Sequence, residues 1–163
     1  MPELPEVETT VRAIDKFENH ILEEIIIHNR NLRWKVETKV QSLTKRKLVV
    51  KITRRAKYIL IYLDDNCLMI HLGMSGKLRI QNNADNYFKK HDHAELIFKN
   101  EKIVFNDVRR FGSIHLSKNP QKHRLIKNLG VEPLSRAFNK FYLRNICENS
   151  NLCIKKLIMD QKY

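Results

Sequence analysis

The sequence KLVVKITRRAKYILIYLDDNCLMIHL, residues 47–72, contains three short runs that are rich in β-branched and aromatic residues. These runs are Lys47–Thr53, Tyr58–Asp64 and Cys67–Leu72. Runs of this composition and length are typical of strands. The segment Asp64–Asn66 separates the second run from the third and predicts a hairpin turn between them. Residues 47–72 therefore predict neighbouring antiparallel strands at the centre of the fold.

Further strands are predicted on both sides of this segment. Ile21–His28, with three consecutive isoleucines at its centre, predicts a strand upstream. Downstream strands are predicted over Lys77–Ile80, His93–Phe98, Lys102–Asn106 and Gly112–Leu116. Near the N-terminus, hydrophobic residues recur at helical spacing and predict a helix from about Pro5 to Phe17.

After Pro120 the pattern becomes helical. One helix is predicted over Gln121–Leu129, ending at Gly130. A second is predicted over Arg136–Asn149, with Ser135 as its N-cap. We therefore expect an α+β protein with an N-terminal helix, about eight strands in a two-layer antiparallel β-sandwich or flattened barrel, and then helices.

The composition is that of a folded protein. Its 163 residues, 42% of them hydrophobic, fit one domain with a sizeable core. No apolar run approaches the ~18 residues of a membrane span, and the acidic N-terminus lacks the apolar region of a secretory signal. Cys67, Cys147 and Cys153 are too few and too widely spaced for a disulfide framework or a four-cysteine zinc site. We therefore expect a cytoplasmic protein without a membrane partner.

The net charge of +13 is unevenly distributed along the chain. Residues 30–57 contain 11 basic residues and 1 acidic residue, whereas residues 1–24 contain 2 basic and 7 acidic residues. A strongly basic protein indicates a polyanionic partner, most often nucleic acid. A solvated basic face is the alternative.

The first residues contain a candidate nucleophile. If Met1 is removed, Pro2 presents a secondary amine, and because α-amines have pKa values of about 8, part of it is neutral near pH 7. Attack of this amine on an aldehydic carbon gives an iminium ion, and the carboxylate of Glu3 can move protons on the same substrate. The alternative is that these residues only begin a helix.

Two further motifs contain candidate nucleic-acid contacts. In Arg54–Tyr58, Lys57 is a candidate phosphate contact or proton donor, or else a solvated lysine. In His71–Gly76, two glycines permit close approach of the backbone and place Met74 at a loop tip. There the methionine either fills the core or inserts between bases.

Two other motifs lie further along the chain. In Asp107–Gly112, an arginine pair beside Phe111 suits hydrogen bonding to base edges and stacking, unless it is a surface turn. His91 and His93 flank an aspartate and suggest a metal site. Because no third ligand is evident, a phosphate-binding or structural role is preferred for the histidines.

Taken in this order, the motifs resemble the formamidopyrimidine-DNA glycosylase family. The matching segments are Pro2–Glu8, Arg54–Tyr58, His71–Gly76, Lys90–His93, Asp107–Gly112, Leu129–Leu134 and Ile154–Lys162. The resemblance covers essentially the whole chain, and the start PELPEVE is highly diagnostic by itself. It implies base-excision DNA repair by an enzyme that excises oxidised purines (8-oxoguanine, formamidopyrimidines) from damaged double-stranded DNA and cleaves the abasic strand by β,δ-elimination.

The resemblance also implies a role for each matching residue. Pro2 attacks the sugar C1′ and holds the Schiff base, Glu3 is its acid/base partner, and Lys57 assists β-elimination. The implied DNA-binding residues are His71, Met74, His91, Arg109, Arg110, Phe111 and Lys155, and Glu6 is an acidic residue near the pocket. Met74, Arg109 and Phe111 fill the gap left by the extruded nucleotide, with Arg109 on the orphaned cytosine.

By the same resemblance, residues 1–134 form the N-terminal catalytic β-sandwich domain, and residues 135–163 form a helical linker and the start of a helix–two-turn–helix domain. Family members end in a four-cysteine zinc finger, which we expect to lie beyond residue 163, so that this chain holds no metal or other cofactor. We expect a truncated monomer with impaired activity. The alternatives are an inactive DNA-binding remnant of the same family and a metal-dependent hydrolase around His91 and His93.

Overall fold

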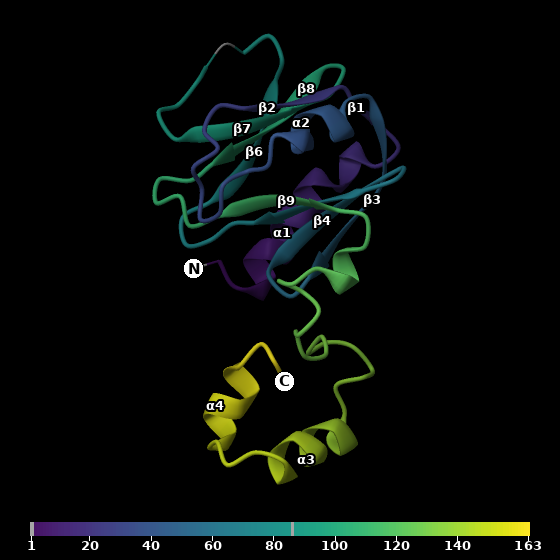
Figure 1. Cartoon of the computed structure of the whole chain (residues 1–163), viewed down its shortest axis with the longest axis vertical. Coiled ribbons are helices and arrows are strands. Elements are labelled where there is room, and N and C mark those ends of the chain that lie inside the picture. Colours follow the sequence, from purple (N-terminus) through teal and green to yellow (C-terminus); the bar gives the residue numbers. More distant parts are fainter. Residues whose placement is uncertain (1, 86) are drawn as a thin grey trace. The chain divides into compact units, whose positions relative to one another are not determined.

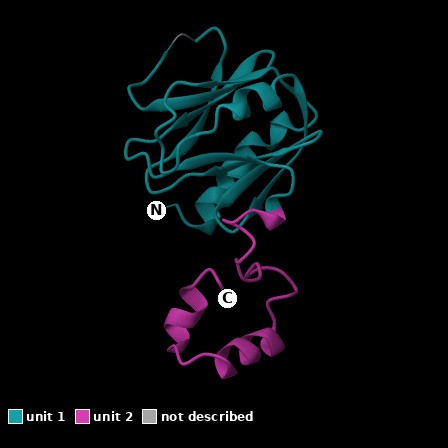
Figure 2. Ribbon diagram, in the orientation of Figure 1, with its two compact units in different colours: residues 1–120 teal, residues 121–163 magenta. Residues whose placement is uncertain are grey.

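The computed structural model describes residues 2–85 and 87–163 of the chain. These residues form two compact units, residues 1–120 and residues 121–163 (Figure 2). The first unit contains both sheets, and the second contains the C-terminal helices. The first unit ends earlier than the domain of residues 1–134 implied by the resemblance. The assignment of residues 135–163 to a helix–two-turn–helix domain stays a prediction.

The first unit is built mainly from strands (Figure 1). In chain order its elements are α1 (Leu4–Ile14), the 3₁₀ turn η1 (Asp15–Phe17), β1 (Ile21–Leu22), β2 (Glu24–Ile27), α2 (Lys39–Thr44), β3 (Lys47–Arg55), β4 (Tyr58–Leu63), β5 (Cys67–His71), β6 (Lys77–Asn82), β7 (Asp92–Ile97), β8 (Glu101–Asn106) and β9 (Ser113–Ser117). The 3₁₀ turn η2 (Pro120–Lys122) follows, and the second unit contains α3 (Lys140–Glu148) and α4 (Ile154–Met159).

The strands form two antiparallel sheets. One has the order β1-β3-β4-β5-β9 and the other has the order β2-β7-β8-β6. The hairpin predicted around Asp64–Asn66 is confirmed, because Tyr58 pairs with His71 and Tyr62 pairs with Cys67. The expected α+β class with an antiparallel two-layer sandwich is also confirmed. Two of the connections that cross between the sheets, from β5 to β6 and from β8 to β9, join strands that are neighbours in both sheets.

The predicted single strand over Ile21–His28 is wrong, because the chain changes sheets within it. β1 pairs with β3 in one sheet, and β2 pairs with β7 in the other. Between them, the Glu23 N–H donates to the Ile97 carbonyl at 2.8 Å, and the Glu23 carbonyl accepts from the Arg46 N–H at 3.0 Å. One hydrophobic run therefore supplies a strand to each sheet. Because this run does not alternate strictly between apolar and polar residues, the sequence does not reveal where it divides.

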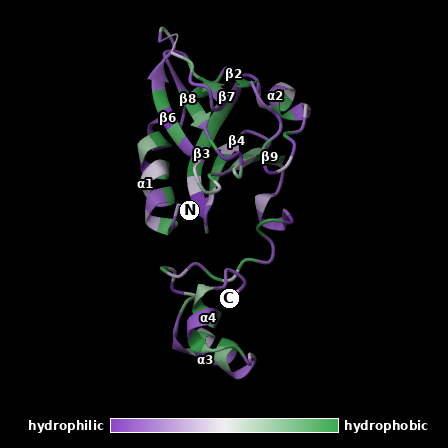
Figure 3. Cartoon of the chain, turned by 90° about the vertical axis from the view of Figure 1, so that its left-hand side faces the viewer, coloured by the Kyte–Doolittle hydropathy of each residue, from purple (hydrophilic) through white to green (hydrophobic). Residues whose placement is uncertain are grey.

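The predicted N-terminal helix is confirmed, and its hydrophobic face packs on the core. Val7, Val11 and Ile14 of α1 are buried, and Figure 3 shows hydrophilic and hydrophobic residues alternating along this helix. The helix ends earlier than predicted, and the 3₁₀ turn η1 continues it to Phe17. The ring of Phe17 stacks on that of Phe98, with their centroids 4.2 Å apart. Helix α1 thereby fixes the N-terminal residues against the sandwich.

The predictions for the second unit need correction. Only η2 and hydrogen-bonded turns occupy the segment predicted as a helix over Gln121–Leu129. The predicted Arg136–Asn149 helix begins later, at Lys140, because the side chain of Asn139 accepts hydrogen bonds from the N–H groups of Phe141 and Tyr142. Ser135 instead closes a turn, in which its hydroxyl donates to the Glu132 carbonyl at 2.8 Å. The N-cap of α3 is therefore Asn139 and not Ser135.

Two short helices, α2 and α4, were not predicted. Each spans only 6 residues, which is too short for a hydrophobic period to be recognised. None of the helices in the described part of the chain is long and apolar enough to cross a membrane.

The core between the sheets predicts that leucine-to-alanine substitutions at buried and exposed positions lower the free energy of unfolding by different amounts. Leu96 is 0% exposed and Leu43 is 43% exposed. Leu96→Ala leaves a cavity and is expected to lower the free energy of unfolding by about 2–5 kcal/mol. Leu43→Ala, the matched control, is expected to cost less than about 1 kcal/mol. Urea unfolding followed by circular dichroism measures both, and equal costs would contradict this assignment of the core.

Candidate functional site

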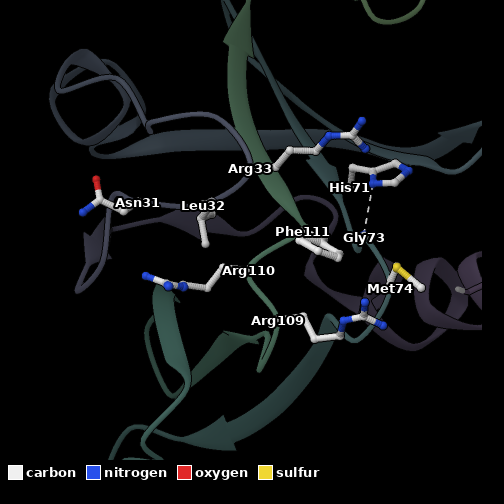
Figure 4. A pocket seen from close by; sticks show the side chains of 9 residues that line it. All are labelled: Asn31, Leu32, Arg33, His71, Gly73, Met74, Arg109, Arg110 and Phe111. Carbon is white, nitrogen blue, oxygen red and sulfur yellow. Dashed lines mark hydrogen bonds between the residues drawn. The ribbon is translucent and has the colours of Figure 1, made fainter.

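A pocket of about 740 Å³ opens on the first unit (Figure 4). Its lining comes from the loop of residues 31–33 and from the β5–β6 and β8–β9 connections, including the end of β5. The lining residues are Asn31, Leu32, Arg33, His71, Gly73, Met74, Arg109, Arg110 and Phe111. Motifs that lie far apart in the sequence therefore meet at one place.

Three of the predicted DNA-binding residues gather on one side of this pocket, as Figure 4 shows. Met74 and Phe111 are 43% and 42% exposed. The guanidinium carbon of Arg109 lies 4.8 Å from the centroid of the Phe111 ring. Half-exposed apolar side chains at loop tips suit insertion between bases, and a guanidinium group can hydrogen-bond a base edge. We call Met74, Arg109 and Phe111 the wedge residues.

Gly73 lets the β5–β6 and β8–β9 connections touch. Its φ of +66° lies in the left-handed region, and an added Cβ would meet the backbone carbon of Phe111 at 2.3 Å. Only glycine tolerates both this conformation and this approach. The first glycine of the His71–Gly76 motif is therefore explained by the packing of one loop on the other.

His71 lines the pocket in its neutral form. Burial, followed by the charges of Arg33 and Lys57, lowers the pKa of His71 from 6.5 to about 4. Its Nδ1 accepts a hydrogen bond from the Gly73 N–H at 3.0 Å, the dashed line in Figure 4. Because Nδ1 is the acceptor, the neutral ring carries its proton on Nε2. His71 can therefore donate one hydrogen bond to an anion without being charged.

The predicted acid/base residues meet beside this region. Lys57 Nζ lies 2.9 Å from Glu3 Oε2, and the lysine side chain is only 16% exposed. Lys57 lies in the two-residue turn between β3 and β4, where Ala56 has a φ of +49°. The charge of Lys57 is one of the causes that lower the pKa of His71, which lines the pocket. The ion pair thus joins the N-terminal segment to the sheet that carries His71.

A second ion pair holds the same two elements together. Arg54 Nε lies 3.2 Å from Glu8 Oε2, and another Arg54 nitrogen donates to the Ala56 carbonyl at 2.9 Å. Hydrogen bonds from Arg12 and then Arg54 lower the pKa of Glu8. Glu8 on α1 and Arg54 on β3 therefore position the start of the chain relative to the Lys57 turn.

Pro2 and Glu6 lie on either side of Glu3 at the start of the chain. Pro2 is partly buried and directly precedes Glu3. Glu6 is exposed, and its Oε2 accepts a hydrogen bond from the Glu3 N–H at 2.8 Å. That bond satisfies a backbone donor at the start of α1. The predicted removal of Met1 concerns a residue outside the described part of the chain.

The remaining predicted residues occupy different places. Arg110, with a φ of +57°, lines the pocket away from Arg109 (Figure 4). His91 is outside the pocket lining, and its carbonyl accepts a hydrogen bond from the Asp107 N–H at 3.0 Å. Lys155 is exposed on α4 of the second unit. The structure therefore brings together most, but not all, of the predicted DNA-binding residues.

The sequence analysis missed the loop of residues 31–33. Its backbone reaches the pocket through the Arg33 N–H, which donates to the Gly112 carbonyl at 3.1 Å. The guanidinium carbon of Arg33 lies 4.7 Å from the ring centroid of Trp34. Arginines beside the chain's one tryptophan, within the most basic stretch, were the available signal for this loop.

The geometry around His91 and His93 favours a structural role. His93 is buried, and its Nε2 donates to the Asp107 carbonyl at 2.7 Å. Among the described residues, no three or more His, Cys, Asp and Glu side chains are grouped so that they could hold a metal ion. The described residues contain three free cysteines, Cys67, Cys147 and Cys153, and not the four-cysteine zinc finger that the resemblance implies for the family.

Comparisons with known proteins agree with these features. The family model of the formamidopyrimidine-DNA glycosylase N-terminal domain matches residues 1–114. Formamidopyrimidine-DNA glycosylases of Cronobacter sakazakii and Legionella pneumophila are 43% and 44% identical to the chain over 99% of its length. The chain spans 60% of the length of these relatives.

Solved structures show the same fold. A Lactococcus lactis formamidopyrimidine-DNA glycosylase bound non-covalently to DNA containing an AP site superposes with a TM-score of 0.87 at 29% identity, covering 99% of this chain and 63% of that one. A complex of the Lactococcus lactis protein with Fapy-dG-containing DNA gives a TM-score of 0.86 at 30% identity, covering 98% and 62%. The resemblance drawn from the motifs is thus confirmed, and the chain belongs to the formamidopyrimidine-DNA glycosylase family.

Proposed function

We propose that this chain carries the chemistry of a bifunctional DNA glycosylase and AP lyase that excises oxidised purines and cleaves the abasic strand. The observation that best supports this proposal is the ion pair of 2.9 Å between Lys57 and Glu3, the residue that directly follows Pro2. A nucleophilic amine, a carboxylate and an ammonium group then lie at one place. The wedge residues lie at the pocket that also contains His71.

The amine of Pro2 is the proposed nucleophile. Its nitrogen forms a bond to C1′ of the damaged nucleotide while the bond from C1′ to the base breaks, and the base leaves with a proton. Opening of the sugar ring gives an iminium ion between Pro2 and C1′. The iminium withdraws electrons from C2′, so that loss of a C2′ proton expels the 3′ phosphate. Loss of the C4′ proton in a second elimination expels the 5′ phosphate, and water then hydrolyses the iminium ion.

Glu3 and Lys57 are the proposed proton carriers. Glu3 takes the proton that the Pro2 nitrogen loses after its attack on C1′ and gives it to the ring oxygen as the sugar opens, and Lys57 contacts the phosphate and assists β-elimination. Their ion pair holds both groups in place before substrate arrives, which reduces the entropy lost in reaching the reactive geometry.

The wedge residues and the basic charge support damaged double-stranded DNA as the partner. Extrusion of a nucleotide costs a few kcal/mol, and side chains that fill the gap offset the lost stacking. His71, His91, Arg110 and Lys155 are proposed to lie on the DNA. The relatives named above include proteins bound to damaged DNA, and we extend that partner to this chain. A cytoplasmic monomer is part of the same proposal.

The Schiff base predicts a covalent complex with abasic DNA. Borohydride reduction is expected to trap wild-type protein on an abasic duplex, and Pro2→Gly is expected to lower the yield at least about tenfold, because it replaces the secondary amine. Pro5→Gly, which loosens the same helix start but keeps the amine, is the matched control. Denaturing gel electrophoresis measures the adduct. An adduct that Pro2→Gly leaves unchanged would overturn the role of Pro2.

The same experiment separates the enzyme from the alternative of a DNA-binding remnant. DNA binding without any trapped adduct would favour the remnant. Mass spectrometry of the intact protein establishes whether Met1 has been removed, since a retained Met1 blocks the amine of Pro2.

The ion pair predicts that Glu3→Gln and Lys57→Met each slow strand cleavage. The expected loss is about 10²–10⁴-fold for each, the usual size for removal of a general acid or base. Because the two groups touch, the double variant is expected to lose less than the product of the single effects. Lys51→Met, which removes an exposed lysine of β3, is the matched control. Equal rates for Lys57→Met and Lys51→Met would remove Lys57 from the mechanism.

The neutral form of His71 predicts proton uptake on DNA binding. A DNA phosphate near His71 favours its protonated form and raises the pKa above the value of about 4 that burial sets in the free protein. The complex then binds more protons than the free protein, so that affinity rises as the pH falls from neutrality towards 4. His71→Asn keeps an acceptor for the Gly73 N–H but does not titrate.

Fluorescence anisotropy with an abasic duplex at several pH values measures this effect. His71→Asn is expected to flatten the rise in affinity, whereas His20→Asn, at an exposed histidine, is expected to retain it. Identical profiles for wild type and His71→Asn would show that no phosphate reaches His71.

A further inference from the structure

Asp107 is a buried acidic residue to which neither the sequence analysis nor the proposed mechanism gives a role. It is 0% exposed and lies directly after β8, at the start of the connection to β9. Burial of a carboxylate is costly unless its oxygens accept hydrogen bonds. Its partners therefore indicate what the residue does.

The carboxylate of Asp107 binds both the β5–β6 and the β8–β9 connection. Oδ1 accepts a hydrogen bond from the Ser75 hydroxyl at 2.5 Å, and Ser75 belongs to the β5–β6 connection. Oδ2 accepts from the Gly112 N–H at 2.7 Å, at the far end of the β8–β9 connection. The Arg109 N–H donates to Asp107 Oδ1 at 3.2 Å and to the Ser75 hydroxyl at 3.1 Å. One carboxylate thus joins the loop of Met74 to the loop of Arg109 and Phe111.

The backbone of Asp107 is held just as closely. Its N–H donates to the His91 carbonyl at 3.0 Å, and its carbonyl accepts from His93 Nε2 at 2.7 Å. Both histidines come from the segment leading into β7 and from β7 itself. Strand β7 therefore anchors the carboxylate, and the carboxylate in turn anchors the loops.

The topology makes this bridge possible. Strands β5 and β9 are neighbours in one sheet, and β6 and β8 are neighbours in the other. His71 pairs with Ser113 and Lys77 pairs with Asn106, so both connections start and end at the same two places. The close approach of Gly73 to Phe111 leaves no space between the two backbones for a larger residue.

We propose that Asp107, through Ser75, is a positioning residue that holds the three wedge residues as one preorganised unit for insertion into duplex DNA. This inference rests on the proposed function. Without the bridge, each loop has to be ordered when DNA binds, and misplacement of groups by about 1 Å can cost about 10²-fold in rate. Duplex DNA requires the wedge, whereas single-stranded abasic DNA has no base stack to fill.

The bridge is tested first by amide hydrogen exchange in the free protein. Ser75→Ala, in one loop, is expected to increase the exchange rates of the Arg109 and Gly112 amides in the other loop by about tenfold. Thr44→Val is the matched control, because it removes a buried hydroxyl that donates only within α2, to the Val40 carbonyl at 2.7 Å. Unchanged exchange of both amides in Ser75→Ala would overturn the proposal without reference to catalysis.

The functional consequence is tested by borohydride trapping on an abasic duplex and on the same strand without its complement. Asp107→Asn and Ser75→Ala are expected to lower the duplex rate about ten- to hundredfold and to leave the single-strand rate close to wild type. Asparagine offers one acceptor oxygen to three donors, so at least one loop loses its hydrogen bond. Ser75→Thr keeps the hydroxyl and is expected to restore the duplex rate.

Glu95→Gln controls for loss of a buried carboxylate. Glu95 is 8% exposed and pairs with Lys102 at 3.1 Å, with no part in either loop. It is expected to change both rates equally. Equal losses on duplex and single strand in Asp107→Asn would reduce Asp107 to a stabilising residue and overturn the proposal. Absence of trapping by wild type on either DNA would mean that the proposed function fails, and the exchange of the Arg109 and Gly112 amides then decides the inference.

Discussion

The arrangement of the site depends on the pairing of strands at the ends of two crossings between the sheets, the β5–β6 and β8–β9 connections. Because β9 pairs with β5 and β6 pairs with β8, both crossings lie side by side. Met74 is at the tip of one, and Arg109 and Phe111 are on the other. The glycine at position 73 and the carboxylate of Asp107 turn this proximity into contact. A pocket lined by distant motifs follows from sheet topology and not from any local preference of the loops.

The proposed chemistry at the N-terminus depends on a different set of contacts. Helix α1 buries one face against the core, and its first residues are joined to the β3–β4 turn by the Glu3–Lys57 and Glu8–Arg54 ion pairs. Exposed ion pairs contribute little to stability. Lys57 and Arg54, however, are only 16% and 12% exposed, so their pairing fixes geometry. Through these contacts, a rigid sheet orients the first residues of the chain, which otherwise have few constraints.

The region of the pocket contains both basic side chains and a neutral hydrogen-bond donor, His71. Burial, followed by the charges of Arg33 and Lys57, lowers the pKa of His71 to about 4 and keeps it neutral near pH 7. The Gly73 N–H also selects the tautomer of His71. A basic surface attracts a polyanion regardless of its sequence. A neutral hydrogen-bond donor that points in a fixed direction instead selects the position of its acceptor. In the proposed function, the net charge of +13 attracts DNA and individual side chains place it.

The sequence by itself determined the strands of residues 47–72, the N-terminal helix and the family, because these depend on local composition, spacing and motif order. It also identified Glu3, Lys57 and the wedge residues as candidates. It did not reveal the change of sheet at Glu23, the contribution of Arg33 to the pocket or the bridging role of Asp107. These features were decided by tertiary structure, because hydrogen bonds between segments far apart in the chain leave no period in the sequence. The partners of a buried carboxylate, in particular, are known only when the loops that supply them have been brought together.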